Sequence, residues 1–77
     1  MTQKNLEKII TALVQKNPQT EKDFFILVRK QAGQLLLPPP EKSQLLAAYR
    51  RLVKNKKIRP ADHLEKLLTK RAVRTLS

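Results

Sequence analysis

Six positively charged side chains within ten residues are the strongest chemical signal in this 77-residue sequence. They are Arg50, Arg51, Lys54, Lys56, Lys57 and Arg59. Lysine offers a mobile point charge and arginine a planar fork of donors, and both suit the oxygens of phosphate groups. No acidic residue lies between Glu41 and Asp62, whereas solvated surfaces normally mix both signs of charge. The cluster therefore predicts binding to a polyanion, of which nucleic acid is the commonest.

The charge is concentrated in the C-terminal half of the chain. Residues 42–77 carry a net charge of +9, whereas residues 1–41 carry +2. A field this strong destabilises a folded protein by self-repulsion, so a polyanionic partner is expected. Further cations extend the candidate site if the last helix packs beside the preceding one: Lys66, Lys70, Arg71 and Arg74. The only aromatic residue of this half is Tyr49, which the core needs, so we expect contacts with the phosphates of folded RNA or of a duplex rather than stacking on bases.

The acidic residues and the single histidine do not form a catalytic or metal-binding pattern. Glu21 and Asp23 begin one predicted helix and Asp62 and Glu65 another, where carboxylates cap the helix or offset its dipole. His63 follows Asp62 directly, but neighbouring helical positions do not face each other, so we expect a surface histidine. The sequence has no cysteine, which excludes disulfides and thiolate metal sites. We expect no catalytic residue, no metal and no cofactor in this chain.

Length and hydropathy predict one small domain over residues 1–77. A hydrophobic content of 40% is enough for a small core. No segment approaches the roughly 20 apolar residues of a membrane span. The first residues lack the apolar stretch of a signal peptide. We therefore expect a cytoplasmic protein without membrane contact.

Apolar spacing predicts two helices in the first half. The first carries a stripe with helical period and ends before Asn17-Pro18, because the residue before a proline avoids helical geometry. This stripe consists of Leu6, Ile9, Ile10, Leu13 and Val14. The second helix opens at Thr20, with Asp23 at the fourth position of a capping-box pattern. Its apolar side consists of Phe24, Leu27 and Val28, widened by Phe25. Gly33 is expected to end it in a left-handed conformation.

A proline-rich linker separates the second helix from the third. Pro38-Pro39-Pro40 removes three backbone donors and favours an extended path. We expect Leu35, Leu36 and Leu37 to fold back onto the core. The connection is about twice the three or four residues of a helix-turn-helix motif, which disfavours that motif.

Two further helices are expected after the linker. The third covers residues 41–55, with one inward stripe and with Arg50, Arg51 and Lys54 on the opposite face. That stripe consists of Leu45, Leu46, Tyr49, Leu52 and Val53. Pro60 suits the first position of the fourth helix, which buries Leu64, Leu67 and Leu68. The expected fold is therefore all-α, a small four-helix domain with an extended C-terminal tail.

The last residues resemble a known family. They read Lys70-Arg71-Ala72-Val73-Arg74-Thr75-Leu76-Ser77. In the Elongator catalytic subunit family, the segment leading into the radical S-adenosylmethionine domain reads Lys-Lys-Pro-Val-Arg-Thr-Leu-Ser-Gly. Residues 37–46 resemble the family's proline-rich entry to a helix, so the resemblance covers about residues 35–77. It departs at Ala72, where proline is usual, and the family's iron–sulfur cysteines are not in this chain.

The resemblance implies a tRNA-binding N-terminal domain of a tRNA wobble-uridine acetyltransferase, of the bacterial or archaeal single-subunit type. The parent enzyme would hold a 4Fe-4S cluster, S-adenosylmethionine and acetyl-CoA, and would install a carboxymethyl-type group on uridine. The expected partners are tRNA and the parent's catalytic domains, with residues 70–77 as the connector. Two alternatives stay open: a stand-alone DNA- or RNA-binding module, and a protein-docking domain that uses Leu35, Leu36 and Leu37.

Overall fold

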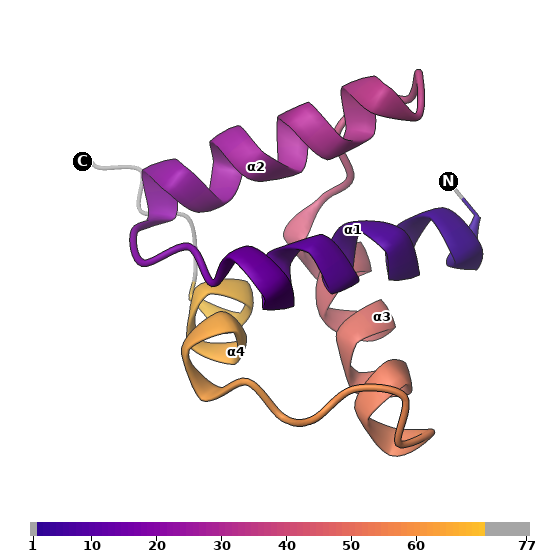
Figure 1. Cartoon of the computed structure of the whole chain (residues 1–77), viewed down its shortest axis with the longest axis vertical. Coiled ribbons are helices and arrows are strands. Elements are labelled where there is room, and N and C mark those ends of the chain that lie inside the picture. The colour runs from indigo at the N-terminus through magenta and orange to yellow at the C-terminus, as the bar shows by residue number, and fades with distance from the viewer. Residues whose placement is uncertain (1, 71–77) are drawn as a thin grey trace.

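A computed structural model describes residues 2–70 of the chain, which form four α-helices (Figure 1). The helices are α1 (Gln3–Lys16), α2 (Glu21–Gln34), α3 (Lys42–Lys54) and α4 (Asp62–Thr69). No strand occurs among residues 2–70, so the all-α, four-helix prediction is confirmed. The predicted tail and connector over residues 70–77 lie outside the described part of the chain, except for Lys70.

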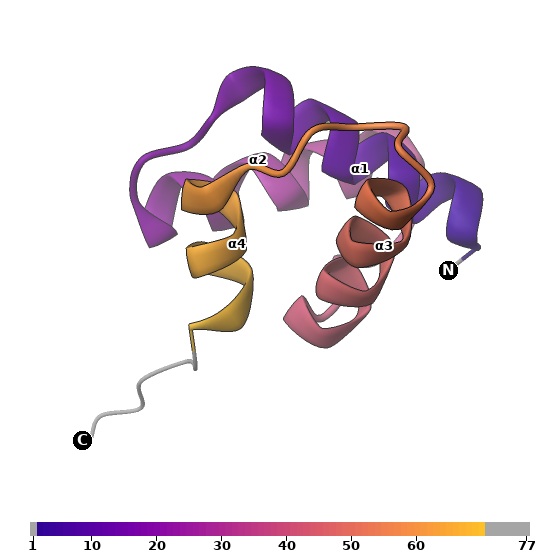
Figure 2. The ribbon, with the colours of Figure 1, turned by 90° about the horizontal axis from the view of Figure 1, so that it is seen from below.

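The four helices pack around α1 and α3. α1 contacts both α2 and α3, and α3 contacts α4. Figure 2 shows α3 and α4 side by side and in opposite directions, below the α1–α2 pair. The start of α3 and the end of α4 therefore lie at the same end of the molecule. Residues 35–41 connect α2 to α3, and this length confirms that the pair is not a helix-turn-helix motif.

A single apolar core takes side chains from every helix. The largest fully buried side chains are Ile9, Ile10, Leu13, Phe24, Leu45 and Leu64. Each such side chain contributes about 1.5–3 kcal/mol on burial. The predicted stripes are confirmed at these positions, and the core also contains Ala32 and Ala48, which the stripes did not include. The prediction that all three leucines before the prolines fold back is wrong for Leu36, whose side chain is 91% exposed.

The starts of the helices follow the predictions in part. The Thr20 hydroxyl accepts a hydrogen bond from the Asp23 N–H at 3.1 Å, which confirms the predicted cap of α2. The prediction that Pro60 occupies the first position of α4 is wrong, because the helix begins at Asp62. The physical reason lies at Ala61, whose carbonyl accepts the first helical bond from the Glu65 N–H at 2.9 Å.

Three helices end in a left-handed residue that is not glycine: Asn17 after α1, Leu36 after α2 and Lys56 after α3. In α2 the prediction for Gly33 is wrong: Gly33 is helical, and Leu36 takes the positive φ of 58°. The Leu37 N–H bonds to the Ala32 carbonyl and the Leu36 N–H to the Gly33 carbonyl, each at 3.0 Å. This pair of hydrogen bonds forms a Schellman motif, which provides donors for the last carbonyl groups of the helix. Its geometry places the left-handed position three residues after the glycine.

The end of α3 repeats this motif. Lys56 has a φ of 59°. The Lys57 N–H bonds to the Leu52 carbonyl at 2.9 Å, and the Lys56 N–H bonds to the Val53 carbonyl at 3.0 Å. The motif turns the chain sharply, so the cations after α3 stay close to its C-terminal end.

Two substitutions at the end of α2, Gly33→Ala and Leu36→Gly, should each stabilise the protein. Gly33→Ala adds a methyl group in open space inside a helix, and Leu36→Gly relieves the left-handed strain of an exposed residue. Each should raise the free energy of unfolding by about 0.5–1 kcal/mol, measured by urea denaturation followed by circular dichroism. If Gly33 were the left-handed residue, Gly33→Ala would instead destabilise the protein.

Candidate nucleic-acid interface

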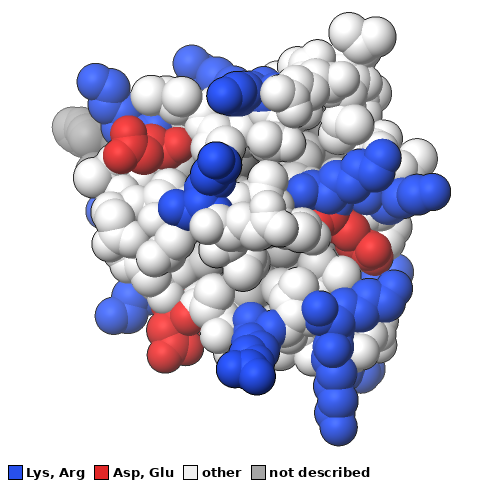
Figure 3. All heavy atoms as spheres, viewed as in Figure 1, with Lys and Arg blue, Asp and Glu red and all other residues white. Residues whose placement is uncertain are grey.

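The strongest concentration of charge lies at the C-terminal end of α3 and in the loop that follows. We call this surface the basic end, and it consists of Arg50, Arg51, Lys54, Lys56, Lys57 and Arg59. All six residues are exposed, which confirms the predicted phasing of α3. Figure 3 shows Lys and Arg gathered at the lower right of the molecule, over this end of α3, with one acidic group at the upper edge of this region. Within residues 2–70, none of the six forms an ion pair.

The basic end has an apolar support. Val53 and Ile58 pack against the core, and together with Pro60 they line a shallow hollow beside Lys56, Lys57 and Arg59. The cations in the last turn of α3, Arg51 and Lys54, also offset the negative end of the helix dipole. Dipole compensation alone does not account for the cations of the loop, which lie beyond the helix. The surface as a whole offers donors for several phosphate groups.

Tyr49 anchors the loop that carries these cations. Its side chain is only 2% exposed, as predicted for a core residue. The Tyr49 hydroxyl accepts a hydrogen bond from the Ala61 N–H at 2.8 Å. Because Ala61 immediately precedes α4, this bond fixes the far end of the loop to the middle of α3.

Of the remaining predicted cations, the structure describes Lys66 and Lys70. Lys66 is exposed on α4, but it shares a shallow surface with Asp62 and Glu65, so this face carries both signs of charge. Lys70 lies at the opposite end of α3, where its carbonyl accepts a hydrogen bond from the Lys42 ammonium at 3.1 Å. Because α4 runs antiparallel to α3, Lys70 lies away from the basic end, and the extension of the surface by the other cations stays a prediction. Arg71 and Arg74 lie outside the described residues.

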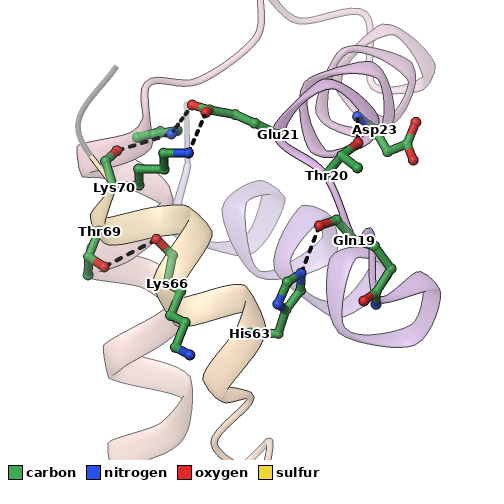
Figure 4. A network of polar contacts seen from close by, with 9 residues as sticks. Gln19, Thr20, Glu21, Asp23, His63, Lys66, Thr69 and Lys70 are labelled. Atoms are coloured by element: carbon green, nitrogen blue, oxygen red, sulfur yellow. Dashed lines mark hydrogen bonds and ion pairs between the residues drawn. The ribbon is translucent and has the colours of Figure 1, made fainter. Parts of the chain in front are cut away.

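Glu21 joins three helices at this opposite end (Figure 4). Its carboxylate lies 2.8 Å from the Lys42 ammonium of α3 and 3.7 Å from the Lys70 ammonium after α4. The hydrogen bond from Lys42, more than the charge of Lys70, holds the pKa of Glu21 below its usual value. Glu21 therefore does more than the dipole compensation predicted for it. No local pattern indicates these pairs, since the partners are distant in sequence.

His63 is tied to the chain rather than free on the surface. Its Nε2 lies 3.0 Å from the Gln19 carbonyl oxygen, in the turn between α1 and α2 (Figure 4). Because a carbonyl oxygen only accepts, Nε2 carries the proton in this contact. The contact fastens the start of α4 to the turn before α2. It gives His63, which was expected at the surface, a structural role.

The described residues form neither a metal-binding cluster nor a membrane-spanning helix. Among residues 2–70, no three His, Asp or Glu side chains come close enough together to hold a metal ion. None of the four helices has the length and apolar character needed to cross a membrane.

Comparisons with protein-family models, with curated proteins and with solved structures give no match to this chain. The resemblance to the Elongator catalytic subunit family therefore stays a prediction.

The Glu21 network should make stability depend on pH in the acid range. The folded state favours the ionised carboxylate, so this stabilisation is complete above the ordinary pKa of Glu21 and is lost as the pH falls through its lowered pKa. Glu21→Gln should destabilise the protein at neutral pH. The urea concentration at the midpoint of unfolding should then fall less steeply for this variant than for wild type as the pH is lowered into the acid range. Glu65→Gln, which removes a carboxylate without an ion pair to another described residue, should keep the slope. Equal profiles for wild type and Glu21→Gln would contradict the role of the network.

Tyr49→Phe should loosen the loop of the basic end without removing any charge. The substitution leaves the partly buried Ala61 N–H without its partner, which costs about 1–3 kcal/mol. Urea denaturation should show this loss, and amide hydrogen exchange should show faster exchange at Ala61. Unchanged exchange at Ala61 would show that the hydroxyl does not anchor the loop.

Proposed function

We propose that this chain is an RNA-binding helical module that holds its ligand by the phosphate backbone. The observation that carries the proposal is the basic end, where six exposed cations have no acidic partner among residues 2–70. Keeping these charges together is unfavourable for the protein alone, since like charges repel. A polyanion removes that repulsion and releases its own counterions.

Folded tRNA is the RNA that we propose for this surface. The basic end carries no aromatic side chain, which favours recognition of backbone and shape over stacking along a strand. The resemblance of residues 35–77 to the Elongator catalytic subunit family supplies the identity of the RNA. In this proposal the chain is a cytoplasmic accessory domain that helps deliver the wobble uridine to a catalytic core using S-adenosylmethionine and acetyl-CoA. That core belongs to the parent enzyme and not to this chain.

Neutralising the basic end should weaken tRNA binding and its dependence on salt. The variant replaces five cations with glutamine: Arg50, Arg51, Lys54, Lys56 and Lys57. We expect the affinity for tRNA to fall at least about tenfold, and the slope of log affinity against log salt to fall by roughly 0.7–0.9 for each lost phosphate contact. Fluorescence anisotropy over a series of salt concentrations measures both quantities.

The chain offers a matched control with the same change in net charge. Five exposed lysines of α1 and α2 are replaced with glutamine: Lys4, Lys8, Lys16, Lys22 and Lys30. If this control weakens binding as much as the first variant, binding depends on net charge alone and the basic end is not the site. Competition with duplex DNA at the same salt tests the second nucleic-acid candidate, which a clear preference for the duplex would favour.

A protein-docking function is the other candidate. Leu36 favours it, because a leucine exposed over 91% of its surface gains from apolar contact with a partner. Failure of the wild-type chain to bind any RNA at low salt, together with capture of the parent's catalytic domains, would support docking instead.

A further inference from the structure

A second hollow lies away from the basic end, between α2 and the proline segment before α3. Its lining includes the partly exposed ring of Phe25, the buried ring of Phe24, and Pro39 and Pro40. The hollow encloses about 300 Å³, the lower end of the roughly 300–1,000 Å³ range of ligand pockets. Its shape and lining suit a flat, largely apolar group.

The aromatic wall is held in place before any ligand arrives. The Phe25 ring is 38% exposed and packs edge-on against Phe24, with 5.4 Å between the ring centroids. The Lys42 ammonium lies 5.2 Å from the centroid of the Phe25 ring, and the Glu21 carboxylate holds that ammonium at 2.8 Å. The ammonium covers one face of the ring, so a planar ligand meets the remaining exposed part of a ring that is already held in place, which lowers the entropic cost of binding.

The lining of the hollow is positively charged as well as apolar. Lys42 already pairs with Glu21, whereas Arg29 also lines the hollow, is exposed and forms no ion pair with another described residue. A guanidinium can bind a phosphate with its planar edge or stack on a ring with its face. A flat apolar ring that carries an anionic group is the chemistry of a nucleotide.

The hollow and the basic end lie along the same helix. Lys42 is the first residue of α3 and Arg50 lies eight residues further on, which corresponds to about 12 Å along the helix axis. This separation is short enough for one strand of nucleic acid to span. A base in a duplex is covered by its neighbours and paired, so only an unpaired base can enter a hollow of this kind.

We infer that this hollow binds one unpaired base of the RNA whose phosphates lie on the basic end. The inference deepens the proposed RNA-binding function and rests on it. The base stacks on Phe25 against the two prolines, and Arg29 contacts the adjoining phosphate. The basic end supplies most of the affinity, while the hollow supplies preference for single-stranded or looped RNA over a duplex.

The test compares two probes, a short oligoadenylate and an RNA duplex of the same length, by fluorescence anisotropy at one salt concentration. Phe25→Leu keeps an apolar side chain but removes the ring. It should weaken oligoadenylate binding by about tenfold, the loss expected when one base loses an aromatic stacking partner, and leave duplex binding unchanged within about twofold. Ile26→Ala is the matched control, since Ile26 is a neighbouring exposed apolar residue of α2 that does not line the hollow.

A second variant and a second measurement cover other outcomes. Arg29→Gln changes an exposed side chain, so we expect this variant to fold even if Phe25→Leu does not. It should also weaken oligoadenylate binding more than duplex binding. Titration of the whole chain with AMP should shift the amide resonances of Phe25 and Arg29 and leave that of Gly33 in place. Equal losses for both probes, or no loss, would overturn the inference while the proposed function stands. AMP shifts at the hollow without any tRNA binding would overturn the proposed function and retain the hollow as a nucleotide site.

Discussion

Burial of one apolar side of each helix against a common core is the constraint on which the rest of the structure depends. The four helices have between 8 and 14 residues, and isolated helices shorter than about 12–15 residues are marginal in water. No disulfide supports them, since the chain has no cysteine. The central helix α1 buries Ile9, Ile10 and Leu13 completely, and α2 and α3 pack on it. α4, the shortest helix, joins this core through three leucines and through the hydrogen bond between Tyr49 and Ala61. The loop that carries much of the basic end is therefore fixed at both ends by core packing rather than by its own sequence.

Charge is the second constraint, and the fold meets it differently at the two ends of α3. At the start of α3, Glu21 brings Lys42 and Lys70 to one carboxylate, so cations that would repel each other hold three helices together. At the end of α3, no such carboxylate is present among residues 2–70, and the cations stay exposed. A chain that needed only to be stable could distribute its few acidic residues more evenly. The concentration of unpaired cations at one end is therefore the feature on which the proposed binding function rests.

The helices and much of the core are predictable from local patterns, whereas contacts between distant segments are not. The helical period of apolar residues depends only on neighbours along the chain, so the stripes of α1 and α3 and the outward phase of Arg50 are correctly predicted. The Glu21–Lys42 and His63–Gln19 contacts join residues 21 and 44 positions apart, and no local spacing encodes them. The antiparallel course of α4, which separates Lys70 from the basic end, is a tertiary feature of the same kind. The prediction for the end of α2 is wrong for another reason. A glycine permits a left-handed conformation but does not require it, and the hydrogen bonds of the Schellman motif place Leu36 in that conformation instead.

Contacts with phosphates and contacts with bases have different consequences, and the fold keeps the two kinds of surface apart. Phosphate contacts give affinity that falls with salt but carry no information about sequence or pairing. A single stacking position adds too little affinity to act alone, yet it distinguishes an unpaired base from a paired one. In this chain α3 joins the two surfaces, with Lys42 near the hollow and Arg50 at the start of the basic end. The helix fixes the distance between the hollow and the basic end. A strand that binds to both must therefore carry an unpaired base at that distance from a series of phosphates. Loops of folded RNA combine these two features, which is why a folded RNA, rather than a uniform duplex, is the ligand that we propose.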